Sequence, residues 1–236
     1  MPDTEHATQT QTLPALKVYW IGGAKGGVGK SLAAMALLDH LVTSGASPLL
    51  IETDTANPDV FKSYEKTVET KLLDLDSRDG WIALLTLCEQ ASGPVVINTG
   101  SRNSLAVSKY ADLLRLGLED LGAELVTLWM INEHRDSLEL LRQFRDALPL
   151  GRVHVLRNQH CASSFPLYET SRLREEIEAS GGLSLNFPVL AGRVTRELYE
   201  RRLTLHAALS SMPFGNRIEL KRWRVAVNEV FSQALA

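Results

Sequence analysis

The chain has 236 residues, enough to build one substantial hydrophobic core, and its 25 basic and 28 acidic side chains give a net charge of −3. This charge excludes a uniformly basic surface, so any nucleic-acid contact must use a local patch. Cys88 and Cys161 match no disulfide or metal spacing, and they suit a reducing, cytoplasmic location. No stretch approaches the ~20 apolar residues that a membrane-spanning helix needs.

Residues 1–14 are rich in Thr and Gln and contain no apolar run, which predicts a disordered tail and not a secretory signal. From residue 15 onward, short apolar runs alternate with longer segments of helical periodicity. Neither an internal repeat nor a long linker divides residues 15–236, so we expect them to form a single domain.

The alternation of strands and helices predicts an α/β fold with a mostly parallel sheet covered by helices on both faces. Strands are predicted at Lys17–Ile21, Pro48–Thr53, Pro94–Asn98, Glu124–Ile131, Val153–Asn158 and Asn186–Leu190. Helices are predicted at Lys30–Ser44, Asp79–Ala91, Ser104–Leu121, Asp136–Leu148, Thr170–Ser180 and Val194–Ser210, with a last one from Asn216. The least regular span is Asn57–Leu75.

A glycine-rich loop follows the first predicted strand and opens the first predicted helix. Gly26, Gly27 and Gly29 let main-chain N–H groups approach phosphate oxygens without Cβ clashes, and the helix N-terminus adds its dipole. Lys30 should reach the β- and γ-phosphates of ATP, and the Ser31 hydroxyl should bind Mg²⁺. The alternative is a glycine-rich turn with an incidental Lys-Ser pair, which the buried strand before it and the apolar helix after it disfavour.

The run Lys25-Gly-Gly-Val-Gly-Lys-Ser31, preceded by Ala24, closely resembles the deviant phosphate loop of the ParA/MinD ATPases. The resemblance implies a P-loop NTPase fold and a homodimer that forms when ATP is bound. In that family the first lysine reaches the partner subunit's nucleotide, so Lys25 is expected to have this catalytic role; otherwise it is a solvated loop lysine. A second cation would offset charge that develops in phosphoryl transfer.

Other positions match the family directly after the second predicted strand, at the end of the fifth and within the sixth. Asp54 resembles the switch carboxylate that positions the attacking water and lies near Mg²⁺; its alternative role is to cap a turn. Asn158 resembles the asparagine that binds the adenine base. The segment Phe187–Leu190, which contains Pro188, and the following Arg193–Leu198 resemble the family's last strand and the loop that closes over the base. The expected residues for ATP or ADP are therefore Lys25, Gly26, Gly27, Val28, Gly29, Lys30, Ser31, Leu32, Asn158 and Pro188, with Ser31 and Asp54 for Mg²⁺.

Two positions depart from the family pattern. The family usually has Asp-x-Asp where this chain has Glu52-Thr-Asp54, and it has Asp at the position of Asn98. An amide forms hydrogen bonds to a Mg²⁺-bound water but lacks the charge of a carboxylate. Nucleotide binding is expected to survive this change, whereas hydrolysis is expected to be slow or to depend more on Asp54.

The spans Thr53–Tyr64 and Asp76–Trp81 resemble the TraL/StbB-like ATPases of conjugative or mobilisable plasmids. This resemblance implies an ATP-driven dimerisation switch in plasmid transfer, mobilisation, partition or stability, with a protein partner from such a system. Arginines 193, 196, 201 and 202 form a DNA-facing patch in one interpretation and a solvated helix face in the other.

Three other functions remain open from the sequence. The helix from Asn216 is basic and amphipathic, which would suit a MinD-type membrane-surface ATPase, although such an apolar face more often packs in the core. Asn98 is compatible with a module that binds ATP and hardly hydrolyses it. An enzyme of the superfamily, a ligase or an iron–sulfur reductase, has little support, because no substrate pocket is recognisable and two lone cysteines fit a cluster poorly.

Overall fold

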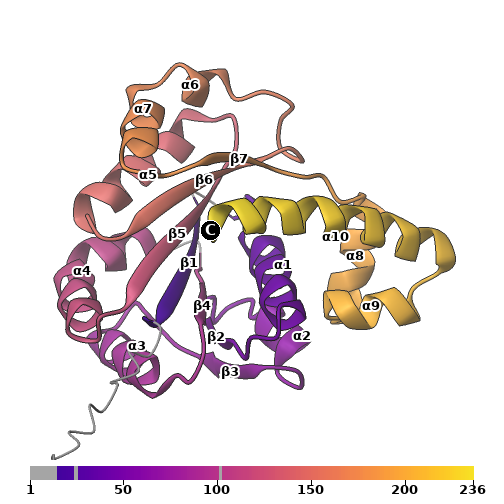
Figure 1. The fold of residues 1–236 in the computed structure, drawn as a ribbon, viewed down its shortest axis with the longest axis horizontal. Coiled ribbons are helices and arrows are strands. Elements are labelled where there is room, and N and C mark those ends of the chain that lie inside the picture. The colour runs from indigo at the N-terminus through magenta and orange to yellow at the C-terminus, as the bar shows by residue number, and fades with distance from the viewer. Residues whose placement is uncertain (1–14, 24–25, 101–102) are drawn as a thin grey trace, which may run out of the picture.

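A single parallel sheet organises the chain in the computed structural model, which describes residues 15–23, 26–100 and 103–236 (Figure 1). Within these ranges the sheet has seven strands in the order β3-β2-β4-β1-β5-β6-β7, and every neighbouring pair is parallel. The strands are β1 (Lys17–Gly23), β2 (Leu49–Glu52), β3 (Glu69–Leu72), β4 (Val95–Asn98), β5 (Glu124–Ile131), β6 (Arg152–Asn158) and β7 (Ser184–Phe187). The predicted α/β class is confirmed.

Helices cover both faces of the sheet (Figure 1). One face packs against α1 (Lys30–Thr43), α2 (Asp59–Tyr64), α8 (Gly192–Glu200), α9 (Leu205–Ser211) and α10 (Phe214–Ala234). The other face packs against α3 (Arg78–Gln90), α4 (Asn103–Asp120), α5 (Arg135–Ala147), α6 (Pro166–Glu169) and α7 (Arg172–Ala179). Because the central strands are buried on both sides, they read as continuous apolar runs in the sequence.

The two cores differ in what fills them. Alanines and leucines of α1 dominate the first core, which lets this helix lie close to the sheet. Aromatic rings fill much of the second: Trp20 of β1 stacks on Trp81 of α3 with ring centroids 6.0 Å apart, and Trp129 of β5 packs on Phe144 of α5 at 4.9 Å. Complete burial of such rings contributes on the order of 2–3 kcal/mol each.

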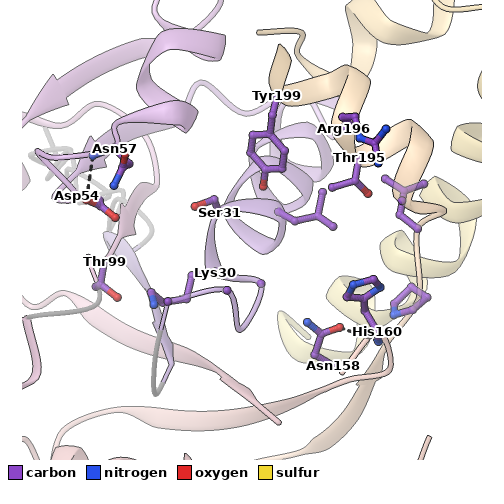
Figure 2. A pocket seen from close by; sticks show the side chains of 17 residues that line it. Lys30, Ser31, Asp54, Asn57, Thr99, Asn158, His160, Thr195, Arg196 and Tyr199 are labelled. Carbon is purple, nitrogen blue, oxygen red and sulfur yellow. Dashed lines mark hydrogen bonds between the residues drawn. The ribbon is translucent and has the colours of Figure 1, made fainter. Parts of the chain in front are cut away.

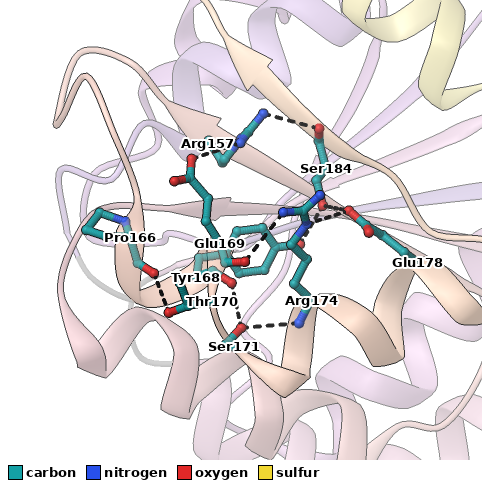
Figure 3. Close-up of polar contacts among 9 residues, drawn as sticks. All are labelled: Arg157, Pro166, Tyr168, Glu169, Thr170, Ser171, Arg174, Glu178 and Ser184. Atoms are coloured by element: carbon teal, nitrogen blue, oxygen red, sulfur yellow. Dashed lines mark hydrogen bonds and ion pairs between the residues drawn. The ribbon is translucent and has the colours of Figure 1, made fainter.

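Polar contacts hold α6 and α7 against the last two strands (Figure 3). Arg157 of β6 pairs with Glu169 at 3.2 Å, and Arg174 pairs with Glu178 at 2.8 Å. The Ser184 hydroxyl at the start of β7 donates to Glu178 at 2.9 Å. Surface pairs of this kind add little stability, so the contacts of Arg157 with Glu169 and of Ser184 with Glu178 mainly fix β6 and β7 relative to α6 and α7.

Most predicted elements are confirmed, and two predictions are wrong. The predicted helix Val194–Ser210 is two helices, α8 and α9, because Arg202 takes a left-handed conformation with φ of 50° and the Thr204 side chain caps α9. The predicted strand Asn186–Leu190 begins and ends earlier, as β7, since Pro188 cannot donate to a strand ladder. The irregular span Asn57–Leu75 contains α2 and β3, an edge strand with too few apolar residues to be recognised.

The sheet order determines where polar residues gather. Strands β1, β4 and β2 are neighbours, so the phosphate loop after β1 lies beside Asn98 at the end of β4 and Glu52 at the end of β2. Asn158 ends β6, on the other side of β1 and β5. In open α/β sheets, ligands bind at this carboxyl edge.

Candidate nucleotide-binding site

A cleft of about 580 Å³ opens at the carboxyl edge of the sheet (Figure 2). Its floor is the phosphate loop and the first turn of α1; Asp54, Asn57 and Thr99 lie at one end, and Asn158 and His160 at the other. Pro188 also lines the cleft. Helix α8 borders the cleft opposite the phosphate loop. The volume lies in the usual range of small-molecule and cofactor sites.

The conformation of the phosphate loop requires glycine. Gly27 has φ of 82°, and Gly29, which precedes α1, has φ of 104°. A Cβ on Gly29 would stand 2.7 Å from the Asn158 side-chain nitrogen, closer than real Cβ contacts allow. The loop therefore presents main chain, not side chains, to the cleft, and the N-terminus of α1 directs its dipole to the same place.

Lys30 and Ser31 are the first residues of α1, and both line the cleft. Lys30 is only 7% exposed, and this burial lowers the pKa of its ammonium, while the nearby Asp54 carboxylate opposes the shift. A cation that burial has partly stripped of water gains more from contact with an anion than a solvated one does. Phosphate oxygens would supply such an anion.

The loop after β2 places Asp54 across the cleft from Lys30 (Figure 2). The Asp54 carboxylate accepts a hydrogen bond from the Asn57 N–H at 3.1 Å, which fixes the turn that follows. Thr99, after β4, donates its hydroxyl to the Ile21 carbonyl of β1 at 2.7 Å. The Thr99 contact joins the ends of β4 and β1 beside the part of the cleft where Mg²⁺ is expected.

Glu52 and Asn98 lie behind Asp54, and they face each other in the register of β2 and β4. The Asn98 amide donates to both Glu52 carboxylate oxygens, at 3.0 Å each. Glu52 is fully buried, which raises the pKa of its carboxyl to about 7, although hydrogen bonds from the Asp54 N–H and from Asn98 favour the charged form.

Asn158 and Pro188 occupy the end of the cleft where a base is expected, and each is fixed by a distant contact. Asn158 donates to the Val28 carbonyl at 2.8 Å and accepts from the His160 N–H at 3.0 Å. The Pro188 carbonyl accepts a hydrogen bond from the Trp223 indole of α10 at 2.9 Å. The last helix therefore supports the wall of the cleft.

Sequence reasoning did not name Asn57, Thr99, His160, Gly192 and Tyr199 as lining residues. It did assign Leu190 and the segment Arg193–Leu198 to the strand and loop beside the base, and Leu190, Thr195 and Arg196 line the cleft. Thr195 and Tyr199 are one turn apart on α8 and point to the cleft (Figure 2). The family resemblance predicted that the segment Arg193–Leu198 is part of a loop that closes over the base, whereas the structure forms helix α8 there. Burial raises the pKa of the Tyr199 hydroxyl, so it stays protonated and can donate.

The structure brings most of the predicted site residues into one cleft: Gly26, Gly27, Gly29, Lys30, Ser31, Leu32, Asp54, Asn158 and Pro188. Val28 differs, because its side chain is buried and only its carbonyl takes part, through Asn158. Ala24 and Lys25 lie outside the described residues, so the role expected for Lys25 stays a prediction. The described ranges contain no cluster of three or more His, Cys, Asp or Glu residues that could hold a metal ion.

These residues fit a nucleoside triphosphate with Mg²⁺. Main-chain donors and Lys30 suit phosphates, while the Ser31 hydroxyl and the Asp54 carboxylate supply the oxygen ligands that Mg²⁺ prefers. Asn98 Oδ1 is buried and has no hydrogen-bond partner in the described part of the chain. A buried acceptor of this kind suits a water molecule of a hydrated cation.

Comparison with known proteins identifies relatives of this chain. The chain is 49% identical to Protein MobD of Acidithiobacillus ferrooxidans over 219 residues, which are 92% of this chain and 96% of that protein. The chain belongs to the MobD family. No family model matches it.

The MobD-family chain also resembles a second relative and a solved structure. It is 31% identical over 116 residues to Protein TraL of Escherichia coli, a match that covers 47% of this chain and 48% of TraL. MinD of Aquifex aeolicus superposes with a TM-score of 0.50 at 13% identity, over 91% of this chain and 96% of MinD. The MobD-family chain thus has the fold of the ParA/MinD-type P-loop proteins, as its phosphate loop predicts.

The main apolar face of the terminal helix, α10, packs against the core of the MobD-family chain. Residues Leu220, Trp223, Val227, Val230, Phe231 and Ala234 are all buried in the core. Among the described helices, none is long and apolar enough to cross a membrane. Arg201, directly after α8, pairs with Glu197 of that helix, in agreement with a solvated helix face, whereas Arg196 lines the cleft.

Proposed function

We propose that this chain binds ATP with Mg²⁺ in the cleft and that bound ATP drives its homodimerisation during plasmid mobilisation. The observation that carries the proposal is the phosphate loop itself. Two positive-φ glycines precede a buried lysine at a helix N-terminus, and a carboxylate faces that lysine across the cleft. This combination of donors and acceptor is specific for polyphosphate with a divalent cation.

In this proposal each side chain has one chemical role. Lys30 holds the β- and γ-phosphates, Ser31 and Asp54 bind Mg²⁺, and Asp54 also orients the attacking water. Mg²⁺ would neutralise charge on the phosphates. Thr99 and Gly100 follow β4, and the Gly100 N–H donates to the Thr53 hydroxyl at 3.2 Å, so both strand ends would respond together to the γ-phosphate.

The dimer rests on Lys25, which is proposed to reach the nucleotide of the second subunit. ATP would then be shared between two copies, and hydrolysis would release them. At the other end of the cleft, Asn158 and Pro188 are proposed to contact the base.

The cellular process follows from the relatives' names. MobD and TraL indicate plasmid mobilisation and transfer, so a protein of such a system is the proposed partner. Arg193 and Arg202 are exposed on and after α8 and would contact DNA non-specifically in the dimer. ATP hydrolysis is proposed as the step that resets the switch.

Two lysine variants test the proposal. Lys30→Ala should abolish detectable ATP binding in a calorimetric titration, whereas Lys66→Ala, which removes an exposed lysine outside the cleft, should bind like wild type. Lys25→Ala should bind ATP but stay monomeric in ATP and Mg²⁺ by light scattering. If Lys25→Ala is as dimeric as wild type, the shared-nucleotide role of Lys25 is wrong; if Lys30→Ala still binds, the site is wrong.

Asn98 supports a second candidate, a module that binds ATP and hardly hydrolyses it. In this case ATP alone would hold the dimer, and release would need a partner. Steady-state turnover by the wild-type protein separates the two. A substantial rate without any partner rules out the second candidate.

A further inference from the structure

The buried acid beside the cleft is on β2, not on β4. Glu52 is fully buried and Asn98 is 2% exposed, and the two are direct partners in the strand register. Both carboxylate oxygens of Glu52 accept from the Asn98 amide at 3.0 Å. An aspartate at position 98 would therefore put two acids face to face, where both cannot stay charged at acceptable cost.

The Glu52 carboxylate also holds the main chain that carries Asp54. Its Oε1 accepts from the Asp54 N–H at 3.0 Å, and the Phe61 N–H near the start of α2 gives it a further hydrogen bond. The Thr53 hydroxyl donates to the Asn98 carbonyl at 3.1 Å. One buried group thus connects the end of β4, the Asp54 loop and α2.

We propose that Glu52 is the positioning residue for Asp54 and that Asn98 is the amide partner which this buried acid requires. The asparagine at position 98 therefore does not leave this part of the site without an acid, because Glu52 lies on the neighbouring strand β2. The inference rests on the proposed role of Asp54 in binding Mg²⁺. It predicts that restoring aspartate at position 98 harms the site unless Glu52 is neutralised at the same time.

The test compares wild type with N98D, E52Q and the double variant E52Q/N98D, all as the full chain. The readout is the factor by which Mg²⁺ tightens ATP binding, with thermal unfolding without nucleotide measured in parallel. N98D should reduce the Mg²⁺ effect about tenfold, because Glu52 loses its amide donor and the two acids must either separate or share a proton. Either change disturbs the Glu52 oxygen that accepts from the Asp54 N–H. In E52Q/N98D the glutamine amide can donate to the new carboxylate, so the Mg²⁺ effect should return to within about threefold of wild type.

Asn57→Asp is the matched control. It adds the same charge at the same end of the cleft, on an exposed residue with no hydrogen bond to Glu52 in the described structure. E52Q should not rescue N57D. Rescue of N98D but not of N57D would show that the direct 52–98 contact matters, not the total charge near Mg²⁺.

The outcomes separate this inference from the proposed function. If wild type binds no ATP, the proposed function fails first. If wild type binds Mg²⁺-ATP and N98D binds it equally well or better, Glu52 does not need Asn98 and the inference is overturned. Losses in E52Q and N98D that simply add in the double variant overturn it as well. If N98D is too unstable to purify, a folded E52Q/N98D protein with a near wild-type Mg²⁺ effect still supports the inference, and one without that effect contradicts it.

Discussion

The side-chain amide of Asn158 donates a hydrogen bond to the main-chain oxygen of Val28 at 2.8 Å, which joins the end of β6 to the phosphate loop. The two residues are 130 positions apart in the chain. A glycine-rich loop is flexible by itself, so a tether that fixes its main chain reduces the ordering that nucleotide binding must supply. Asn158 therefore prepares the loop in addition to any contact with a base.

The first prediction concerns this tether. In Asn158→Ala, the Val28 carbonyl and the His160 N–H lose their partner, which costs about 1–3 kcal/mol for a buried group, and ATP affinity should fall about tenfold. Asn132→Ala is the control: Asn132 makes a similar contact, with the His134 N–H at 3.1 Å, after β5 and away from the cleft. Isothermal titration measures both. Equal affinities for the two variants would contradict the tether.

The second prediction separates strain from crowding in the phosphate loop. Gly29→Ala should lose ATP binding, because the new Cβ combines a left-handed backbone with a clash against Asn158. Gly45→Ala has the same type of strain at φ of 85° but no atom within 4 Å of the new Cβ. It should cost about 1 kcal/mol of stability and leave ATP affinity unchanged. If Gly29→Ala binds as well as Gly45→Ala does, the loop tolerates more movement than its contacts suggest.

The third prediction uses two buried tryptophans on opposite faces of the sheet. Trp223→Phe removes the donor to the Pro188 carbonyl, and Trp81→Phe removes the donor to the Leu75 carbonyl at 2.8 Å. Both changes leave a carbonyl without its partner and should destabilise the fold by about 1–3 kcal/mol. Only Trp223→Phe should weaken ATP binding, by a few-fold. Binding of inorganic triphosphate, which has no base, should be the same in both variants; a difference there would place Pro188 near the phosphates.

The elements that the sequence predicts best are those whose pattern is local. Buried strands such as β5 appear as long apolar runs, and the phosphate loop has its functional residues side by side in the chain. β3 was missed because it lies at the sheet edge, where no apolar run is needed. The break between α8 and α9 was missed because a capping threonine and one left-handed arginine leave the helical periodicity almost intact.

The site was predictable where its residues follow strands, and not where packing brings a helix to it. Tyr199 and Thr195 reach the cleft because α8 lies over the phosphate loop, which depends on contacts along the whole length of the domain. The departures at Glu52 and Asn98 were each visible in the sequence. Their mutual contact was not, because the sequence does not state that β2 lies next to β4.

The fourth prediction concerns acid stability. Burial, with some help from Arg152, lowers the pKa of His154 from 6.5 to about 4. Its Nδ1 accepts from the Leu183 N–H at 3.1 Å, so the neutral ring is the form that fits. Between pH 6.5 and pH 4, His154 is protonated in the unfolded chain but neutral in the folded chain. The stability that is present above pH 6.5 is therefore lost as the pH falls, by up to roughly 3 kcal/mol.

Replacement of this ring tests the assignment. His154→Asn should flatten the dependence of the unfolding free energy on pH in this interval, as measured by urea unfolding at several pH values. His134→Asn, which changes an exposed imidazole, should keep the wild-type slope. A wild-type slope in His154→Asn would assign the acid sensitivity to other groups.

The contact between Trp223 and Pro188 has a consequence for the order in which the protein is made. A ribosome releases the phosphate loop early, but the wall at Pro188 gains its support only when the last helix has emerged and packed. A nascent chain would therefore hold nucleotide poorly until its synthesis is almost complete. A product that ends between β7 and α10 would keep the glycine-rich loop but lack the helix whose Trp223 supports Pro188.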